Sequence, residues 1–192
     1  LDSVYNIYQL QEIKNKVVEV HLFSGNPDTA LSILNETFSL ITPVNSSFND
    51  LMEIRDIINY YYTDVDEPDK KAFKQFLKAE YLLKQRKISE ASQLLNHTIE
   101  KNSAIKIIPL ISLRRAILLL KMKKFDQALN QIISIENSIF GDKSIIMSGQ
   151  IYEQVYSDNE KAMEYYMRII NDYTDSIYFE PVRYHIRMLN NS

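Results

Sequence analysis

Residues 79–95 read AEYLLKQRKISEASQLL, and the same arrangement returns at residues 116–132 as AILLLKMKKFDQALNQI. The alanine that opens each stretch is followed by a second alanine twelve residues later. A third version has Gly149 and Ala162 at these places and is one residue longer. Small side chains at two fixed places let two antiparallel helices approach closely. The pattern therefore predicts a repeated helix hairpin.

The rest of the chain also has the apolar spacing of helices, and no stretch alternates in the manner of a strand. Of 192 residues only 3 are glycine and 5 are proline, which disfavours β folds rich in tight turns and glycine-rich phosphate loops. We therefore predict an all-α protein. Ten helices are expected, at about residues 4–23, 28–41, 48–63, 69–85, 88–101, 106–122, 125–138, 143–156, 159–172 and 179–189.

Proline and glycine mark several of the expected helix boundaries. Pro27 follows Asn26, which fits a cap residue and the first turn of a helix. Pro43 follows an apolar helix and is expected to stop it. Gly141 follows another predicted helix, where we expect a cap residue in the left-handed conformation.

The overall composition is ordinary for a globular protein. Hydrophobic residues make up 45% of the chain, and 22 basic residues stand against 25 acidic ones, for a formal net charge of -3. This balance excludes global disorder. There is no cysteine, which excludes a disulfide scaffold, a cysteine-ligated zinc site and a cysteine nucleophile. No apolar run reaches the roughly 18 residues expected of a membrane-spanning helix.

The repeated hairpin resembles the tetratricopeptide repeat family, whose repeat of about 34 residues has the pattern W-x2-L-G-x2-Y, then A-x3-F, then P. The last copy in this chain matches the second step with Gly149-x2-Tyr152 and the third with Ala162-x3-Tyr166, and has Thr174 in place of the proline. The two preceding copies contain Ala116-x2-Leu119, Phe125-x2-Ala128-x3-Ile132, Ala79-x2-Leu82 and Ile88-x2-Ala91-x3-Leu95.

A weaker copy begins the chain, with Gly25 at the turn and then Ala30-x3-Leu34. Ala30 and Ala91 are 61 residues apart, which is too long for one period and too short for two. The resemblance implies one right-handed α-solenoid domain over residues 1–192. Its parts are a degenerate repeat at 8–42, an inserted irregular helix at 48–63, repeats at about 72–102, 109–140 and 142–175, and a capping helix at 179–189.

In the family, the first helices of successive repeats line a concave face that binds other proteins, and the resemblance implies such a groove here. The implied groove positions are Phe73, Phe76, Glu80, Lys84, Leu110, Leu113, Arg114, Ile117, Lys121, Gln150 and Glu153. Some family members clamp peptide C-termini with lysines and asparagines, but here Phe76 and Glu80 occupy those places and only Arg114 fits. We therefore expect a helical or extended segment of a partner to bind through apolar side chains rather than through a C-terminal carboxylate.

The resemblance thus implies a non-catalytic scaffold or adaptor whose partner is another protein or a peptide segment. Two alternatives stay open. The helix at 48–63 could cover part of the groove, and the module could be purely structural and dock against the rest of a larger polypeptide of its own. The adaptor and the purely structural module differ in whether a second protein is needed to protect the groove from solvent.

Other function classes lack support in the sequence. His21, His97 and His185 lie far apart and outside any metal-binding motif, so no metal site or cofactor is expected. No nucleophile elbow is present, and no catalytic residue is expected. The basic cluster at 121–124 is short and is followed by Asp126, so the chain lacks the basic stripe that nucleic-acid binding requires.

The chain begins at Leu1 rather than methionine, which suggests the C-terminal fragment of a larger protein. The stretch Tyr173-Thr174-Asp175-Ser176, followed by a helix with two arginines, is similar to the end of bacterial repeat proteins of envelope assembly. This similarity favours a bacterial origin and the periplasm or cell envelope as compartment, with the cytoplasm as the alternative.

Overall fold

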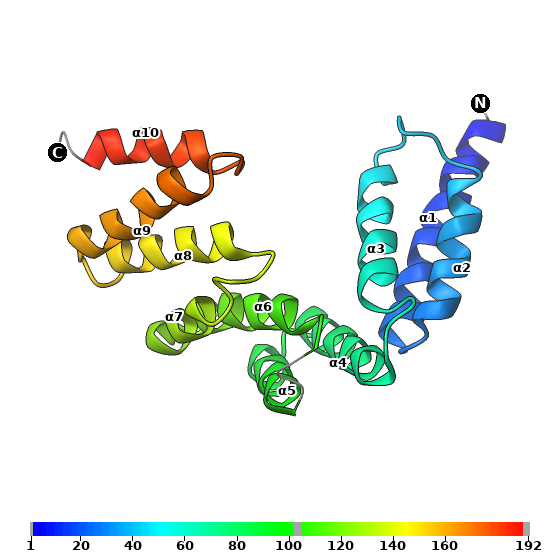
Figure 1. Cartoon of the computed structure of the whole chain (residues 1–192). Helices are drawn as coiled ribbons and strands as arrows, with labels where there is room; N and C mark the ends of the chain where they lie inside the picture. Colours follow the sequence, from blue (N-terminus) through cyan, green and yellow to red (C-terminus); the bar gives the residue numbers. More distant parts are fainter. Residues whose placement is uncertain (1, 102–104, 190–192) are drawn as a thin grey trace. The chain divides into compact units, whose positions relative to one another are not determined.

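The computed structural model describes residues 2–101 and 105–189 of the chain (Figure 1). These residues form ten α-helices and no strand, which confirms the all-α prediction. The helices are α1 Asp2–Phe23, α2 Pro27–Phe38, α3 Phe48–Tyr61, α4 Glu67–Lys84, α5 Ile88–Lys101, α6 Ile108–Lys121, α7 Phe125–Ile133, α8 Gly141–Gln154, α9 Asn159–Asp172 and α10 Phe179–Leu189.

The helices form two compact units, residues Leu1–Ile107 and Ile108–Ser192. In the first unit α2 packs on α1 and α3, while α4 packs on α1, α3 and α5. In the second unit α6, α7, α8, α9 and α10 each pack on the next helix along the chain. Within each unit, packing between consecutive helices is the arrangement of a helical solenoid.

Three of the helix hairpins share one type of turn. Gly25, Arg86 and Lys123 have φ angles of 79°, 63° and 58°, in the left-handed region. In each turn the next residue's N–H bonds to the carbonyl oxygen five residues earlier, as in Lys87 N to Leu82 O at 2.9 Å. This bond satisfies carbonyl groups that the end of a helix leaves unpaired. The left-handed residue lies five positions before a fully buried alanine, which is Ala30, Ala91 or Ala128.

The α8–α9 turn differs because it contains the extra residue that the sequence predicts. Ser157 takes the left-handed conformation with φ 55°, and the N–H of Asp158 bonds to Tyr152 O, six residues earlier, at 2.9 Å. The Asp158 side chain then accepts a bond from Lys161 N at 3.0 Å and caps α9. The added residue is absorbed in the turn, and Ala162 is fully buried like its counterparts.

The small residue of α8 is required by close helix packing. A Cβ atom added to Gly149 would lie 2.6 Å from Cε1 of Tyr166 on α9, closer than carbon atoms approach in proteins. Ala116, the corresponding residue of α6, is also fully buried and belongs to a cluster with Leu129 and Ile132 of α7. These contacts confirm that small side chains permit the close approach of the paired helices.

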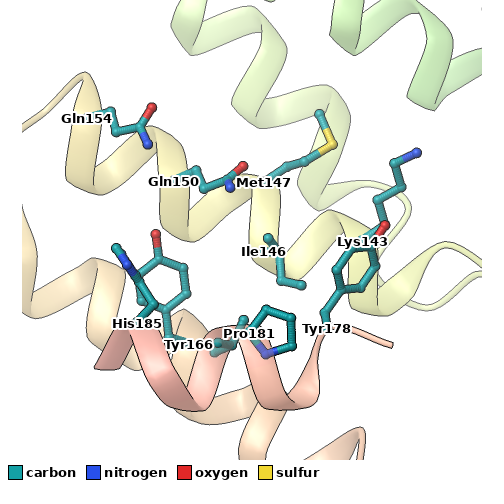
Figure 2. Close-up of a pocket in the computed structure, with 10 residues that line it drawn as sticks. Lys143, Ile146, Met147, Gln150, Gln154, Tyr166, Tyr178, Pro181 and His185 are labelled. Carbon is teal, nitrogen blue, oxygen red and sulfur yellow. The ribbon is translucent and has the colours of Figure 1, made fainter. Parts of the chain in front are cut away.

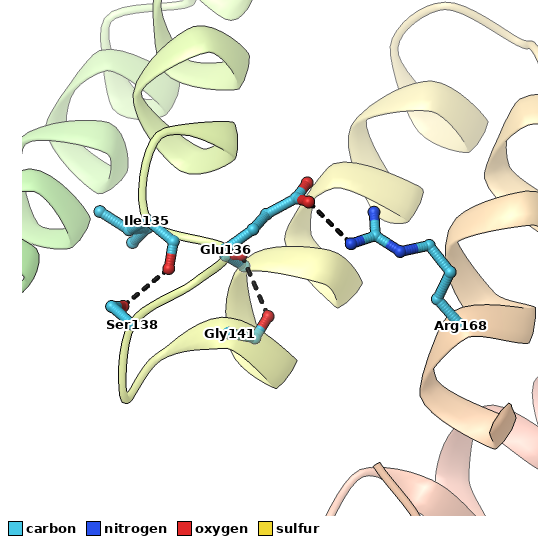
Figure 3. Close-up of polar contacts among 6 residues, drawn as sticks. Ile135, Glu136, Ser138, Gly141 and Arg168 are labelled. Atoms are coloured by element: carbon cyan, nitrogen blue, oxygen red, sulfur yellow. Dashed lines mark hydrogen bonds and ion pairs between the residues drawn. The ribbon is translucent and has the colours of Figure 1, made fainter. Parts of the chain in front are cut away.

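Gly141 corrects one prediction. It is not a left-handed cap after a helix that ends at residue 138, because α7 ends at Ile133 and Gly141 is the first residue of α8. The chain between them turns through short-range bonds, such as Ser138 Oγ to Ile135 O at 2.7 Å (Figure 3). A Cβ at Gly141 would lie 2.5 Å from the Glu136 carbonyl oxygen, so glycine is needed for space. Arg168 of α9 binds Glu136 Oε2 at 2.7 Å and fixes this turn (Figure 3).

A second type of turn leads into α3, α8 and α10. A side-chain oxygen of Asn45, Ser138 or Ser176 accepts the backbone N–H two residues later, at 2.9, 3.1 and 3.2 Å respectively. Each helix begins three residues after this acceptor. The same local bond therefore sets the start of all three helices.

Candidate functional site

A hollow of about 320 Å³ opens on the second unit between α8, α9 and α10. Its lining is largely apolar, with polar side chains from both flanking helices (Figure 2). The lining residues are Lys143, Ile146, Met147, Gln150 and Gln154 of α8, Tyr166 of α9, Tyr178 of the preceding turn, and Pro181, Val182 and His185 of α10. We call this hollow the α8–α10 groove.

Helical spacing explains how α8 supplies one wall. Ile146, Gln150 and Gln154 are four residues apart and therefore share one face of the helix. On the opposite wall, Val182 and His185 are three residues apart on α10 and also point to one side. The turn at Ser176 sets where α10 begins, so it also sets which of its side chains enter the groove.

The floor of the groove is a packed core. Ile145, Ile146, Tyr166, Ile169 and Val182 are buried in one cluster that joins α8, α9 and α10. Tightly interlocked side chains resist rearrangement, because any shift forfeits many van der Waals contacts. The groove is therefore a preformed feature of the second unit.

Three polar groups from three helices meet at one edge of the groove. Tyr166 OH donates to Glu153 Oε2 at 2.6 Å, and His185 Nε2 lies 2.8 Å from the same oxygen. The His185 ring meets the Tyr166 ring edge to face, with centroids 5.3 Å apart. These contacts tie α10 to the α8–α9 hairpin, because each helix contributes one member of the group.

The two acidic groups of this triad have shifted pKa values. Burial acts to raise the pKa of Glu153, but the hydrogen bonds from Tyr166 and His185 outweigh it, so this pKa is lowered. Burial, together with the bond to the Glu153 carboxylate, raises the pKa of Tyr166 above its usual range. Glu153 therefore carries its charge, and Tyr166 its proton, through the neutral pH range.

The match to a family model decides the family of the chain. The model of the tetratricopeptide repeat-like domain matches residues 45–188, well over half of the chain. The chain belongs to the tetratricopeptide repeat-like family. Comparisons with curated proteins and with solved structures gave no match. The tetratricopeptide repeat-like match includes α3, which lies in the segment where the sequence pattern predicts an interruption, and it also includes most of α10.

Tetratricopeptide repeat-like domains are generally non-catalytic and suggest a role in protein interaction. Among the residues that the structure describes, no three metal-ligating side chains come together. No described helix has both the length and the apolar character needed to cross a membrane.

Two of the expected groove residues lie at this site. Gln150 lines the α8–α10 groove, and Glu153 holds its edge through Tyr166 and His185. Along α6 of the same unit, Leu113 is buried, Lys121 is exposed, and the remaining expected residues are half-buried, namely Leu110, Arg114 and Ile117.

The other four expected groove residues lie on α4 in the first unit. Phe73 is fully buried and packs on the rings of Tyr62 and Phe76, with centroids 5.6 and 6.3 Å away. Glu80 is half-buried. Lys84 binds Glu19 of α1 at 3.0 Å, so it joins α4 to α1. The complete groove of eleven residues stays a prediction, and the structure assigns Phe73 to the core of the first unit.

The sequence pattern missed the half of the site that α10 provides. The sequence pattern predicts a capping helix here and so does not place Val182 and His185 at a groove. A signal was present: Ser176-Ile177-Tyr178 repeats the pattern of Ser138-Ile139-Phe140, which precedes α8. This similarity indicates that α10 begins in the same way as α8, and residues of both helices line the α8–α10 groove.

Proposed function

We propose that the chain is a non-catalytic scaffold that binds a segment of a partner protein in the α8–α10 groove. The observation that carries the proposal is the hollow of about 320 Å³, preformed over a packed floor and lined largely by apolar side chains. Such a hollow suits an apolar side chain of a partner, because burial of apolar surface is the main driving force of association.

The polar groups around the hollow support binding rather than catalysis. Glu153, a carboxylate at its edge, is held in its charged form by Tyr166 and His185. A general acid or base at neutral pH needs a pKa near that pH, which a lowered glutamate pKa does not provide. The triad instead holds the two walls of the groove together.

The test fills the groove without changing its charge. Gln150→Trp places a bulky ring in the hollow, and Gln127→Trp places the same ring on the exposed face of α7 as a matched control. Each protein is immobilised and exposed to extract of the source cells, and bound proteins are cross-linked and identified by mass spectrometry. A partner that binds the wild type and Gln127→Trp, and is lost with Gln150→Trp, is the expected result. Equal capture by all three proteins would reject the groove.

A second candidate function is a structural module that docks against another part of its own polypeptide. One observation favours it: Ile13, Val17 and Val20 form an exposed apolar stripe along α1, at spacings of four and three residues. Hydroxyl-radical footprinting of these residues, in this chain and in the protein isolated from its cells, tests this candidate. Protection in the isolated protein without any second protein supports it, and equal labelling argues against it.

A further inference from the structure

The α8–α10 groove has one cation at its rim and no unengaged carboxylate among its lining residues. Lys143 is half exposed at the end opposite the Glu153 triad, and no ion pair joins its ammonium group to a carboxylate within the described residues. The acceptor oxygen Oε2 of Glu153 is already bound by Tyr166 and faced by His185.

This charge distribution favours an acidic partner. An ammonium group beside an apolar hollow gains most from a carboxylate, since a charge-assisted hydrogen bond strengthens when water is excluded. A basic residue of a partner would meet Lys143 with like charge, which is unfavourable. The rim of the groove therefore selects Asp or Glu next to the residue that enters the hollow.

The apolar surface continues from the groove along α10. Pro181 lines the hollow, and Tyr184 and Met188 follow it at three and seven residues, on the same face of the helix. The Tyr184 and Met188 side chains are 65% and 54% exposed. Large apolar side chains exposed in a row beside a hollow mark a contact surface, and methionine adapts to partners of different shape.

The two glutamines of the α8 wall indicate the conformation of the bound segment. Gln150 and Gln154 are both exposed and lie one helical turn apart. A carboxamide offers two donors and an acceptor, so it matches the free N–H and C=O groups of an extended backbone. A helical segment has already used these groups internally and would gain little from the two amides.

We propose, resting on the proposed function, that the α8–α10 groove binds an extended segment of a partner protein in which a large apolar residue stands next to an Asp or Glu. The apolar side chain seats on Ile146 and Val182, the acidic residue pairs with Lys143, and the two glutamines bind the backbone. A helical segment and a second copy of this chain are the other outcomes that the test distinguishes.

The test begins with a random dodecapeptide library on phage, selected on the immobilised chain. The expected peptides contain an acidic residue beside a large apolar one. A fluorescein-labelled peptide with the selected sequence, and a version with its acidic residue replaced by lysine, are then titrated and followed by anisotropy. The lysine version is expected to bind the wild type at least about tenfold more weakly.

Charge reversal on the protein provides the sharper measurement. Lys143→Glu should invert the preference between the two peptides, whereas Lys71→Glu, an exposed lysine of α4, should leave it unchanged. Far-UV circular dichroism checks that both variants keep their helices. An unchanged preference with Lys143→Glu, selected peptides without acidic residues, or no selected peptide at all would overturn the inference.

The Gln150→Trp variant separates this inference from the proposed function. If the selected peptides lack acidic residues but still lose binding with Gln150→Trp, the inference fails and the groove keeps its proposed function. If the peptides bind Gln150→Trp as well as the wild type, both proposals fail. Sedimentation equilibrium addresses self-association: a dimer that Gln150→Trp dissolves would replace the peptide by a second copy of the chain.

Discussion

Helices α8 and α10 begin with the same kind of turn but differ at the position eleven residues after the serine of that turn. A serine precedes each by three residues, and its Oγ accepts the N–H of the second residue after it. Eleven residues after that serine, α8 has Gly149, packed on Tyr166 of α9, while α10 has the exposed Arg187. The difference teaches that one entry turn can begin helices whose side chains at the corresponding position meet different surroundings, a packed tyrosine ring in α8 and solvent in α10.

Helix α3 follows the same rule in the first unit. Asn45 provides the entry turn, and Asp56, eleven residues later, is an exposed charge at the crossing position. Burial of a charge away from water costs several kcal/mol, so close packing of a second helix at Asp56 would be unfavourable. This explains why α3 stands between two hairpins as a single helix.

The largest loss of unfolding free energy is expected from a substitution at Gly149, where α8 crosses α9. Gly149→Val adds atoms where a Cβ would already lie 2.6 Å from the Tyr166 ring, and we expect a loss of about 3 kcal/mol of unfolding free energy. Arg187→Val, at the matching place on α10, should change it by less than about 0.5 kcal/mol because the residue is exposed. Urea unfolding followed by circular dichroism measures both. Equal losses would break the comparison.

Removal of the phenol hydroxyl that joins α9 to Glu153 of α8 should have the next largest effect. Tyr166→Phe deletes the 2.6 Å hydrogen bond to the Glu153 carboxylate and leaves the ring packing in place. We expect a cost of about 1–2 kcal/mol in urea unfolding, since bonds to charged groups are stronger than neutral ones. An unchanged free energy would show that solvent replaces the bond.

The entry turn of α10 can be tested through its serine. Ser176 Oγ accepts the N–H of Tyr178 and donates to Asp142 Oδ2 at 2.7 Å, so it joins the start of α10 to the start of α8. Ser176→Ala should cost about 1 kcal/mol, and Ser176→Thr, which keeps a hydroxyl, should restore most of it. Thermal unfolding compares the two variants. Equal melting temperatures for both would contradict the role of the hydroxyl.

The smallest expected effect is on how the free energy of unfolding changes at acidic pH. The pKa of Glu153 is lowered in the folded protein from its ordinary value of 4.5, so the folded state favours the charged form. This contribution is complete above pH 4.5 and is lost as the pH falls through the lowered pKa. The free energy of unfolding of Glu153→Gln should therefore fall less steeply with acid than that of the wild type. Parallel slopes would argue that the triad does not stabilise the fold.

The positions of the helices follow from the sequence because local signals decide them. Apolar spacing, Pro27 and the buried alanines are all readable along the chain, and the ten helices lie where these features predict. The ends of helices were predicted less well. Helix α7 stops at Ile133, and the chain then turns toward α8, where Gly141 needs the space beside Glu136. That requirement comes from tertiary packing.

The sequence predicts residues of the candidate site only on the helix that matches the repeat pattern of the family. Gln150 and Glu153, two of the expected groove residues, lie at the α8–α10 groove because they are on α8, which matches the repeat pattern closely. His185 and Val182 were missed because their importance depends on how α10 packs against α8, which no spacing along α10 reveals. Phe73 shows the opposite error. The repeat pattern places it in the groove, but in the structure it is buried in the core, with the Tyr62 ring packed on it.

The extra residue between α8 and α9 has a consequence for how chains of this kind change length during evolution. Each residue inserted within a helix rotates everything after it by about 100°, which would turn Ala162 away from its neighbour. At Ser157 the insertion only changes the acceptor of the Asp158 N–H, which is the carbonyl oxygen six residues earlier instead of five. The hairpin turns are therefore the places where insertions, peptide tags or new termini should be tolerated, with the helix interfaces unchanged.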